Sequence, residues 1–472
     1  MQIDIQQIEQ IFLRTTELIP EIYLCGLYLV VLIAGFFRRS SAYIVELTVI
    51  GVVIHILVLF FFFVPSAEGG LWQVDAISQF AKVFMSVALL LAIILFRKNS
   101  SLAEEYYSLL IAILLGAQLL TMARHFLIMF IAVELISLSS YGLVFFRFRA
   151  EATASAIRYL IFGGASSAIS LYGISLIYGI NGTFFWHQID VSVVPKNAAI
   201  AICFLALASL FFKISLFPFH VWVSDVYQQL PLQVLAFLSV VPKIAAGVAL
   251  YQFSKHIPPA ISIFLLGSVA LLSMLVGNLG ALSQKGMRKL FAFSSIAHAG
   301  FLIVAIIPRT ISGVHAFLFY GIVYALMNYA FVWILDWQES LTEDDSLTFW
   351  RGIGNIQPFV GIEVTTLMIS LVGLPITAGF TTKLLAFSAL WEYYELEKHV
   401  FLIVVLIVGL LNALISLFYY LKIPYLMYFQ KHTTANYLSF ARSIVLTVLI
   451  FPLLVLFFFP NVILNFLFVL IK

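Results

Sequence analysis

Residues 210–225 read LFFKISLFPFHVWVSD, and this stretch decides the fold. Lys213 stands among phenylalanines, Pro218 follows five residues later, and no second charge arrives until Asp225. The apolar run around them extends over residues 197–229, 33 residues in all, whereas about 20 apolar residues are enough for a helix to cross a bilayer. Because proline removes a helical hydrogen bond and clashes with the preceding turn, this run predicts a membrane helix that is broken near Pro218.

The composition is that of an integral membrane protein. Of the 472 residues, 63% are hydrophobic and 10% are charged, against about 25% charged in a soluble domain. The net charge of +3 is small and the basic residues do not cluster, so no nucleic-acid partner is expected. Cys25 and Cys203 lie in separate apolar runs without a Cys-x-x-Cys pair, which predicts two small buried side chains rather than an iron–sulfur site. The acidic, polar start predicts no cleavable signal peptide.

The pattern of apolar runs predicts an all-α membrane protein with about fourteen transmembrane helices. The expected spans are 18–37, 42–64, 76–96, 106–122, 126–146, 157–180, 197–229, 232–254, 259–283, 290–307, 313–335, 359–391, 399–421 and 443–470. The seventh and the twelfth are both too long, and each has a proline near its middle, Pro218 and Pro375. Interrupted spans in corresponding parts of a transporter indicate its ion path. Because these two are five spans apart, they cross in opposite directions, so spans 4–8 and 9–13 are predicted to form two inverted five-helix repeats.

This reading divides one membrane domain into four segments. They are an N-terminal three-helix segment at 1–104, a first repeat at 105–254, a second repeat at 255–421 and a C-terminal helix at 422–472. Loops after the odd-numbered spans hold more Lys and Arg than the other loops and the termini together. The positive-inside rule therefore predicts that both termini lie on the outer side.

Five ionisable residues lie well inside the predicted spans: Glu134, Lys213, Lys243, His298 and Lys383. A charge at mid-bilayer costs about 2.5–3.5 kcal/mol on insertion. For any single lysine or glutamate the alternative is a snorkelling end residue or a structural ion pair, and for His298 it is a neutral packing histidine. Desolvation disfavours an ammonium group and a nearby carboxylate restores it, so the set predicts a proton relay. One carboxylate among three lysines suits H⁺ better than Na⁺ or Ca²⁺, which need more oxygen ligands.

Other positions have more modest interpretations. Asp75 and Lys82 are seven residues apart, hence on one helix face, where a structural or subunit contact is at least as good an interpretation as transport. Gly163 and Gly164 favour close helix packing rather than a phosphate loop. A structural role is expected for three further residues in the spans, Glu46, His55 and His315.

Seven stretches carry a family resemblance. They are VELISLSSY at 133–141, FKISLFPFHVWVSDVYQQLP at 212–231, AFLSVVPKIAAG at 236–247, MRKLFAFSSIAHAGFLI at 287–303, YALMNYAFVW at 324–333, RGIGNIQP at 351–358 and GLPITAGFTTK at 373–383. With them the chain resembles the antiporter-like membrane subunits of proton-pumping NADH–quinone oxidoreductase, respiratory complex I, and most of all the N type. The family is also related to subunits of multi-subunit Na⁺/H⁺ antiporters.

The resemblance implies a role for each buried charge. It makes Glu134 the proton-pathway glutamate, Lys213 the central pumping lysine and Lys243 the connecting lysine. His298 then stands in the relay before Lys383, the terminal lysine. The implied supporting positions are Pro218 and His220 at the first helix break, Pro375 at the second, and Tyr324 in the eleventh span.

Two features indicate the N type. The M type usually has Glu where Lys383 stands, and the L type continues into a long lateral helix, whereas this chain ends at LFVLIK. The chain departs from the family at Val223–Ser224, where Ala-Pro is common, at Gln229, where Gly is usual, and at Phe293, which is usually Tyr. The first two departures concern the local geometry after the break in the seventh span.

The resemblance implies a redox-free, proton-translocating subunit. NAD, FMN, the iron–sulfur clusters and quinone would be bound by other subunits, and no cofactor or metal is expected in this chain. The expected partners are the neighbouring membrane subunits and the lipid bilayer of a bacterial inner membrane, with the mitochondrial inner membrane as the alternative. A component of a cation/H⁺ antiporter and a structural spacer that pumps nothing remain the rival interpretations.

Overall fold

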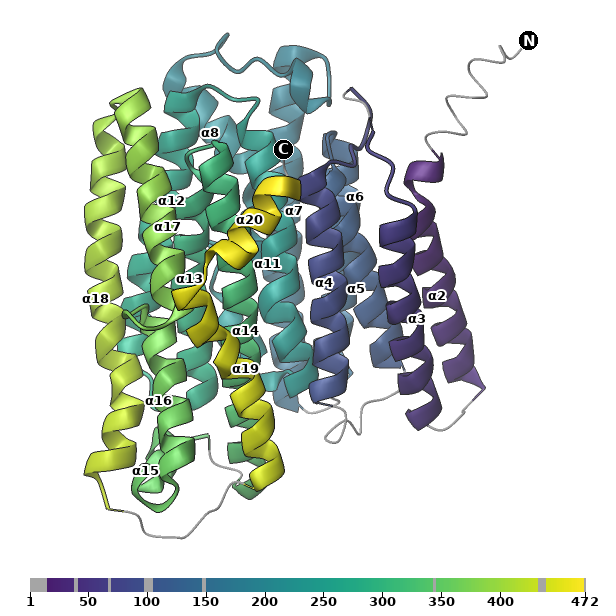
Figure 1. Ribbon diagram of the computed structural model, residues 1–472. Coiled ribbons are helices and arrows are strands. Elements are labelled where there is room, and N and C mark those ends of the chain that lie inside the picture. The colour runs from purple at the N-terminus through teal and green to yellow at the C-terminus, as the bar shows by residue number, and fades with distance from the viewer. Residues whose placement is uncertain are drawn as a thin grey trace. The chain divides into compact units, whose positions relative to one another are not determined.

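A computed structural model describes residues 15–37, 41–66, 69–96, 105–146, 150–342, 345–431 and 439–470. In these ranges the regular elements are helices, and extended residues meet only in isolated bridges such as Trp72 with Ala123 (Figure 1). Twelve helices there are long and apolar enough to cross a membrane, or thirteen if one bent pair counts as a single span. The prediction of an all-α, multi-pass membrane protein is therefore confirmed.

The chain forms two compact units. The first comprises Met1–Lys213 and Gln229–Ile257. Its helices are α2 (Ile19–Phe36), α3 (Ser41–Phe61), α4 (Ala76–Leu95), α5 (Glu105–Met122), α6 (Phe126–Phe145), α7 (Ala150–Asn181), α8 (Lys196–Ala206), α9 (Ala208–Ile214) and α11 (Leu232–Ser254). Every residue of α11 is buried, as expected for a helix that is hydrophobic all round. It packs against α4 and α5 and so forms the core of this unit.

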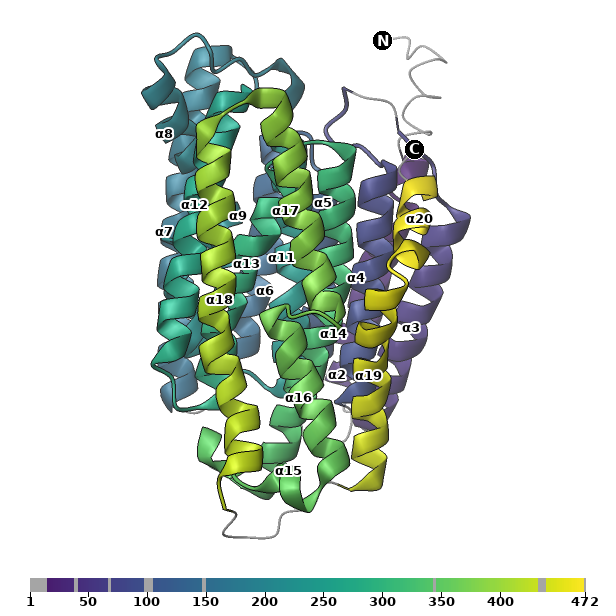
Figure 2. The same cartoon turned by 60° about the vertical axis from the view of Figure 1, so that its left-hand side comes forward.

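The second unit comprises Ile214–Gln228 and Pro258–Lys472. Its helices are α10 (Trp222–Gln229), α12 (Pro259–Leu282), α13 (Met287–Ile306), α14 (Ile311–Leu341), α15 (Ile353–Ile356), α16 (Pro358–Val372), α17 (Ala378–Glu397), α18 (Val400–Phe429), α19 (Phe440–Phe458) and α20 (Asn461–Leu470). Helix α18 runs along both α12 and α16 (Figure 2). Helices α13 and α14 are mostly buried and form the core of the second unit.

The two long predicted spans are interrupted. Helix α8 bends by 54° into α9, residues 215–221 are not helical, and the helix resumes as α10. Helix α16 ends at Val372 and α17 begins at Ala378. Each gap contains its proline and also a side-chain-bearing residue in the left-handed region, Ser215 at φ 71° and Ile376 at φ 78°. Such a conformation is unusual for any residue but glycine and a clear outlier for a β-branched one, so both breaks are held by their surroundings.

Two expectations need correction. The segment 443–470 is not one continuous helix, because α19 ends before Pro460 and α20 follows it. Cys203 is buried as expected, but Cys25 is exposed on α2.

Candidate functional site

Lys213 lies in the last turn of α9, just before the break, and is 3% exposed. Its Nζ has no hydrogen-bond partner among the described residues. Instead it faces aromatic rings, at 5.5 Å from the centroid of Tyr141, 5.7 Å from Tyr159 and 5.5 Å from Phe212. Ring faces attract a cation electrostatically, but they accept no proton in a regular hydrogen bond. The site can thus hold this lysine either charged or neutral.

Glu134 is the carboxylate that the sequence predicts to act on that lysine. It lies on α6, partly buried, and accepts a hydrogen bond from Oγ of Ser167 on α7. No salt bridge joins it to Lys213 within the described ranges. A charge that acts from beyond contact distance changes the proton affinity of a lysine without fixing its protonation.

Small residues of α7 position the lysine. A Cβ at Gly163 would lie 1.7 Å from the Tyr141 hydroxyl, so only glycine lets that ring lie beside Lys213. Ser170 Oγ donates to the carbonyl of Ala206 at 2.6 Å, which seats the bend between α8 and α9 against α7. The expected close packing therefore holds at Gly163 but not at Gly164, whose Cβ would meet nothing within 4 Å.

The segment after the break contains two predicted supporting residues, Pro218 and His220. Pro218 is exposed and His220 is half-buried, with its ring stacked 5.7 Å from that of Phe217. The Phe217 N–H donates to Oγ of Ser273 on α12 at 2.9 Å. This bond ties the non-helical segment to α12, within the second unit.

Lys243 lies midway along α11 and is 1% exposed. Pro242 precedes it inside the helix. Because proline has no N–H, the carbonyl of Leu238 lacks its helical donor, and a polar group is thereby freed in the turn that carries the lysine. Glu134, Lys213 and Lys243 all belong to the first unit.

His298 is the centre of a tyrosine cluster in the second unit. Its Nδ1 lies 2.8 Å from the hydroxyl of Tyr320 on α14, and its Nε2 lies 3.4 Å from that of Tyr420 on α18. Tyr324, a predicted supporting residue, has its ring 5.5 Å from the imidazole and its hydroxyl 3.2 Å from Ser295 Oγ. Hydroxyls and imidazole both donate and accept protons, so this cluster can pass a proton between helices.

Lys383 lies on α17 directly after the second break, which contains Pro375. It is 6% exposed, its Nζ donates to the carbonyl of Val372 at 2.6 Å, and Nζ lies 4.4 Å from the ring centroid of Phe301. Gly373 ends α16 in the left-handed conformation at φ 81°. The three buried lysines thus have three different surroundings: aromatic rings, a proline-interrupted helix and a helix C-terminus.

Two buried carboxylates, Glu21 and Glu363, were not predicted as site residues from the sequence. Glu21 on α2 is 4% exposed and forms a 2.6 Å salt bridge with Lys82. Glu363 on α16 is 5% exposed and accepts hydrogen bonds from Ser443 at 3.0 Å and Thr447 at 2.5 Å. Both glutamates fall inside apolar spans expected from the sequence. An acidic residue within such a span is the sequence signal that could have identified them.

The pair Asp75 and Lys82 does share one face of α4, but the two residues have different partners. Asp75 caps α4 and forms a 2.8 Å salt bridge with Arg124. Within the described ranges, no group of three His, Cys, Asp or Glu side chains is arranged to hold a metal ion.

Comparison with known proteins identifies the family. Residues 123–416 match the model of the NADH:quinone oxidoreductase/Mrp antiporter transmembrane family. A protein named NADH-quinone oxidoreductase subunit N from Chlorobium chlorochromatii is 32% identical over 89% of this chain and 86% of its own length. Among solved structures, a chain of respiratory complex I from Thermus thermophilus matches with a TM-score of 0.78 at 27% identity, over 95% of this chain and 99% of that one.

A chain of the Mrp complex from Dietzia sp. shares the fold alone, with a TM-score of 0.76 at 19% identity, over 97% of this chain and 96% of that one. The family match covers more than half of the chain, and the relative from Chlorobium covers most of it. This chain therefore belongs to the NADH:quinone oxidoreductase/Mrp antiporter transmembrane family.

Proposed function

We propose that this chain is the proton-translocating membrane subunit, of N type, of an NADH–quinone oxidoreductase. The observation that carries the proposal is the setting of Lys213, a buried ammonium group beside a helix break that faces three aromatic rings and has no hydrogen-bond partner among the described residues. A lysine so placed can gain and lose a proton when the charges around it move slightly. The relatives named as subunit N supply the enzyme in which that proton movement would be used.

The relay has named members. Glu134 sets the proton affinity of Lys213, and protons pass from there through Lys243 and then His298 with intervening water to Lys383. The supporting residues are Pro218, His220 and Pro375 at the helix breaks and Tyr324 beside His298. Irregular backbone is tolerated at membrane depth only where it is buried or lines a wet cavity, which is why both breaks belong to the path.

The proposed architecture has fourteen crossings. It counts α8 to α10 as one broken span, α16 with α17 as another, and α19 with α20 as the last. The repeats are then residues 105–254 and 255–421, between the segments 1–104 and 422–472. The chain lies in a bacterial inner membrane with both termini on the outer side, following the distribution of Lys and Arg.

Redox chemistry belongs to other subunits of the same complex. NAD, FMN, iron–sulfur clusters and quinone bind there, and the released energy reaches this chain through its contacts with neighbouring membrane subunits. The second candidate is a subunit of a multi-subunit cation/H⁺ antiporter, which the shared family model and the likeness in fold to the Mrp complex chain favour.

The test is Lys213→Ala in membranes that contain the assembled complex. NADH oxidation and proton uptake are measured together, and the expected result is fewer protons taken up per NADH. The control is Lys398→Ala, which removes an exposed lysine paired with Glu395 at the end of α17 and is expected to leave the ratio unchanged. An unchanged ratio in Lys213→Ala with normal assembly would make the chain a spacer. Na⁺-dependent proton exchange without NADH would make it an antiporter subunit.

A further inference from the structure

Helix α4 carries a line of polar side chains that the proposed relay does not use. Asp75, Ser78, Gln79, Lys82 and Ser86 follow the spacing of one helix face. The rest of the helix is almost wholly apolar. A polar face along a membrane helix is costly unless it meets other polar groups, and here it meets them on α2, α3 and α5.

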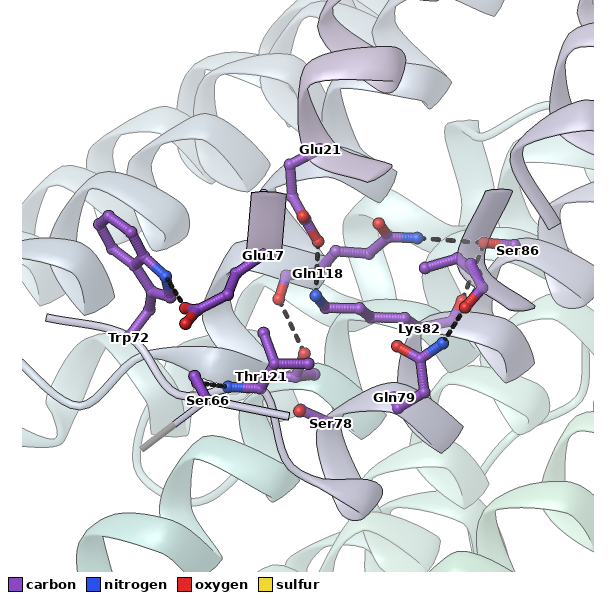
Figure 3. A network of polar contacts seen from close by, with 12 residues as sticks. Glu17, Glu21, Ser66, Trp72, Ser78, Gln79, Lys82, Ser86, Gln118 and Thr121 are labelled. Carbon is purple, nitrogen blue, oxygen red and sulfur yellow. Dashed lines mark hydrogen bonds and ion pairs between the residues drawn. The ribbon is translucent and has the colours of Figure 1, made fainter. Parts of the chain in front are cut away.

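The centre of this polar line is a fully buried ion pair. Lys82 Nζ lies 2.6 Å from Glu21 Oε1, and the two residues are 1% and 4% exposed. Figure 3 shows both side chains reaching toward each other from α4 and α2. Taking two charges out of water is not repaid by their attraction alone, so further polar groups are expected around them.

Such groups continue the line on the side of Lys82 away from Asp75. Ser86 Oγ donates to the carbonyl of Lys82 at 2.8 Å, and Gln118 Nε2 on α5 donates to Ser86 Oγ at 3.1 Å (Figure 3). The same amide nitrogen lies 2.9 Å from Nε2 of His55 on α3. With the amide nitrogen as donor, His55 Nε2 accepts, and a neutral ring then carries its proton on Nδ1.

Three atoms of this cluster are buried with neither a hydrogen bond nor an ion pair to any described residue. They are Oε2 of Glu21, Oε1 of Gln118 and Nδ1 of His55, whereas Oε1 of Glu21 is paired with Lys82. Buried polar atoms in folded proteins are almost always paired, with protein or with ordered water. Because these three atoms are concentrated in one cluster, ordered water is expected to complete the hydrogen bonding there.

The other end of the line opens into a cavity of about 290 Å³. Its lining includes Asp75, Arg124, Gln252 and Lys255, and Asp75 accepts from both Arg124 and Gln252 at 2.8 Å. A cavity of this size holds several water molecules. Lys82 lies seven positions after Asp75 along α4, a rise of about 10 Å.

We propose that Glu21, Lys82, Gln118 and His55 form a second proton site, in the N-terminal helices, which exchanges protons with water through the cavity at Asp75. The Lys82 ammonium gives a proton to the Glu21 carboxylate, which leaves a neutral pair, and the carboxyl proton passes through water to Nε2 of His55, which is freed when the Gln118 amide turns its oxygen toward the ring. Return of a proton from the cavity recharges Lys82, and the same steps in reverse release the His55 proton to the cavity water. The site rests on the proposed proton-translocating function and adds to it a branch outside the relay of Glu134, Lys213, Lys243, His298 and Lys383.

The test is the double variant Glu21→Gln with Lys82→Met, made in the assembled complex. Removing one partner leaves a lone buried charge, whereas replacing both with neutral residues of similar size preserves folding. The expected result is normal assembly and NADH oxidation with a loss of protons taken up per NADH. A purely structural ion pair predicts an unchanged ratio, and that result would overturn the proposal.

A second variant keeps the test independent of the ion pair. His55→Gln retains an acceptor for the Gln118 amide but exchanges no proton near neutral pH, and it is expected to lower the same ratio. The control is the double variant Glu395→Gln with Lys398→Gln, an exposed pair with the same change of charge. If Lys213→Ala lowers the ratio and neither cluster variant does, the second site is wrong and the proposed function stands. If Lys213→Ala leaves the ratio unchanged, the proposed function itself is wrong, and the second site, which rests on it, falls with it.

Discussion

Lys383 Nζ donates a hydrogen bond of 2.6 Å to the carbonyl oxygen of Val372, across the break between α16 and α17. Carbonyl groups at the C-terminus of a helix carry partial negative charge. The ammonium group is therefore stabilised by the end of a neighbouring helix, and a small movement of that end would weaken the stabilisation. The break in this span thereby places a helix C-terminus against the ammonium group of Lys383.

Gly373→Ala is predicted to disturb this arrangement. Gly373 has φ 81°, and a Cβ there would lie 2.8 Å from Cδ of Lys383. The left-handed backbone alone costs a residue with a side chain about 1–2 kcal/mol. We expect lower thermal stability of the detergent-solubilised complex and fewer protons taken up per NADH.

A matched control separates backbone strain from displacement of the lysine. Gly182 has a similar φ of 67°, but a Cβ there would meet nothing within 4 Å. Gly182→Ala is therefore expected to lower stability by a comparable amount without changing the proton ratio. Equal loss of proton uptake in both variants would show that Lys383 is not the cause.

Two neighbouring glycines of α7 give a second prediction. Gly163→Ala forces the Tyr141 ring away from Lys213, because the new Cβ would lie 1.7 Å from the tyrosine hydroxyl. Gly164→Ala meets no atom within 4 Å and gains up to about 1 kcal/mol of helix propensity. We expect reduced proton uptake per NADH in the first variant and unchanged or slightly raised thermal stability in the second. A normal proton ratio in Gly163→Ala would contradict a role for the Tyr141 ring.

The sequence was most informative where an apolar run is too long for one crossing and contains a proline. The excess length around Pro218 and Pro375 predicted helix interruptions, because one crossing needs only about 20 residues. The bend between α8 and α9 has no proline or other local signal in the sequence, since it depends on packing against α7 through Ser170. The left-handed Ser215 and Ile376 could not be predicted either, because neither residue favours that conformation.

Contacts between residues far apart in the sequence could not be predicted from it. Helical spacing placed Lys82 on the face of Asp75, but it gives no information about contacts between helices. Glu21, the partner of Lys82, lies on α2, and the tyrosines around His298 come from α14 and α18. Such contacts follow from how the helices pack, which no local pattern in one chain encodes.

The carboxylate of Glu363 gives a third prediction. It accepts hydrogen bonds from Thr447 and Ser443 of α19. Thr447→Val removes one donor, and a buried charged group left short of a partner costs about 1–3 kcal/mol or more. We expect a lower thermal midpoint of the purified complex in Thr447→Val and also in Glu363→Ala.

The double variant decides whether these groups act together. Residues in direct contact show interaction energies of about 0.5–3 kcal/mol, so Glu363→Ala combined with Thr447→Val is expected to cost less than the sum of the single changes. The control is Thr366→Val, an exposed threonine of α16 whose hydroxyl bonds only within its own helix, to Ile362. Strict additivity of Glu363→Ala and Thr447→Val would refute the coupling.

His125 gives a pH-dependent prediction outside the membrane spans. It precedes α6, and its Nδ1 accepts a hydrogen bond from the Leu127 N–H at 3.1 Å. Burial beside Phe184 and Phe185 lowers the pKa of His125 below its ordinary value of 6.5. The unfolded chain therefore takes up this proton at higher pH than the folded chain, so stability is lost as pH falls from about 7 through 6.5 to the folded pKa.

The measurement is the thermal midpoint of the solubilised complex between about pH 7.5 and pH 5.5. His125→Asn is the matched variant, because asparagine is an equally good N-cap acceptor and does not titrate in this range. Its midpoint is expected to fall less steeply on acidification than that of the natural chain, with little difference at the upper pH. Parallel curves for the two proteins would mean that the cap of α6 does not depend on a neutral His125.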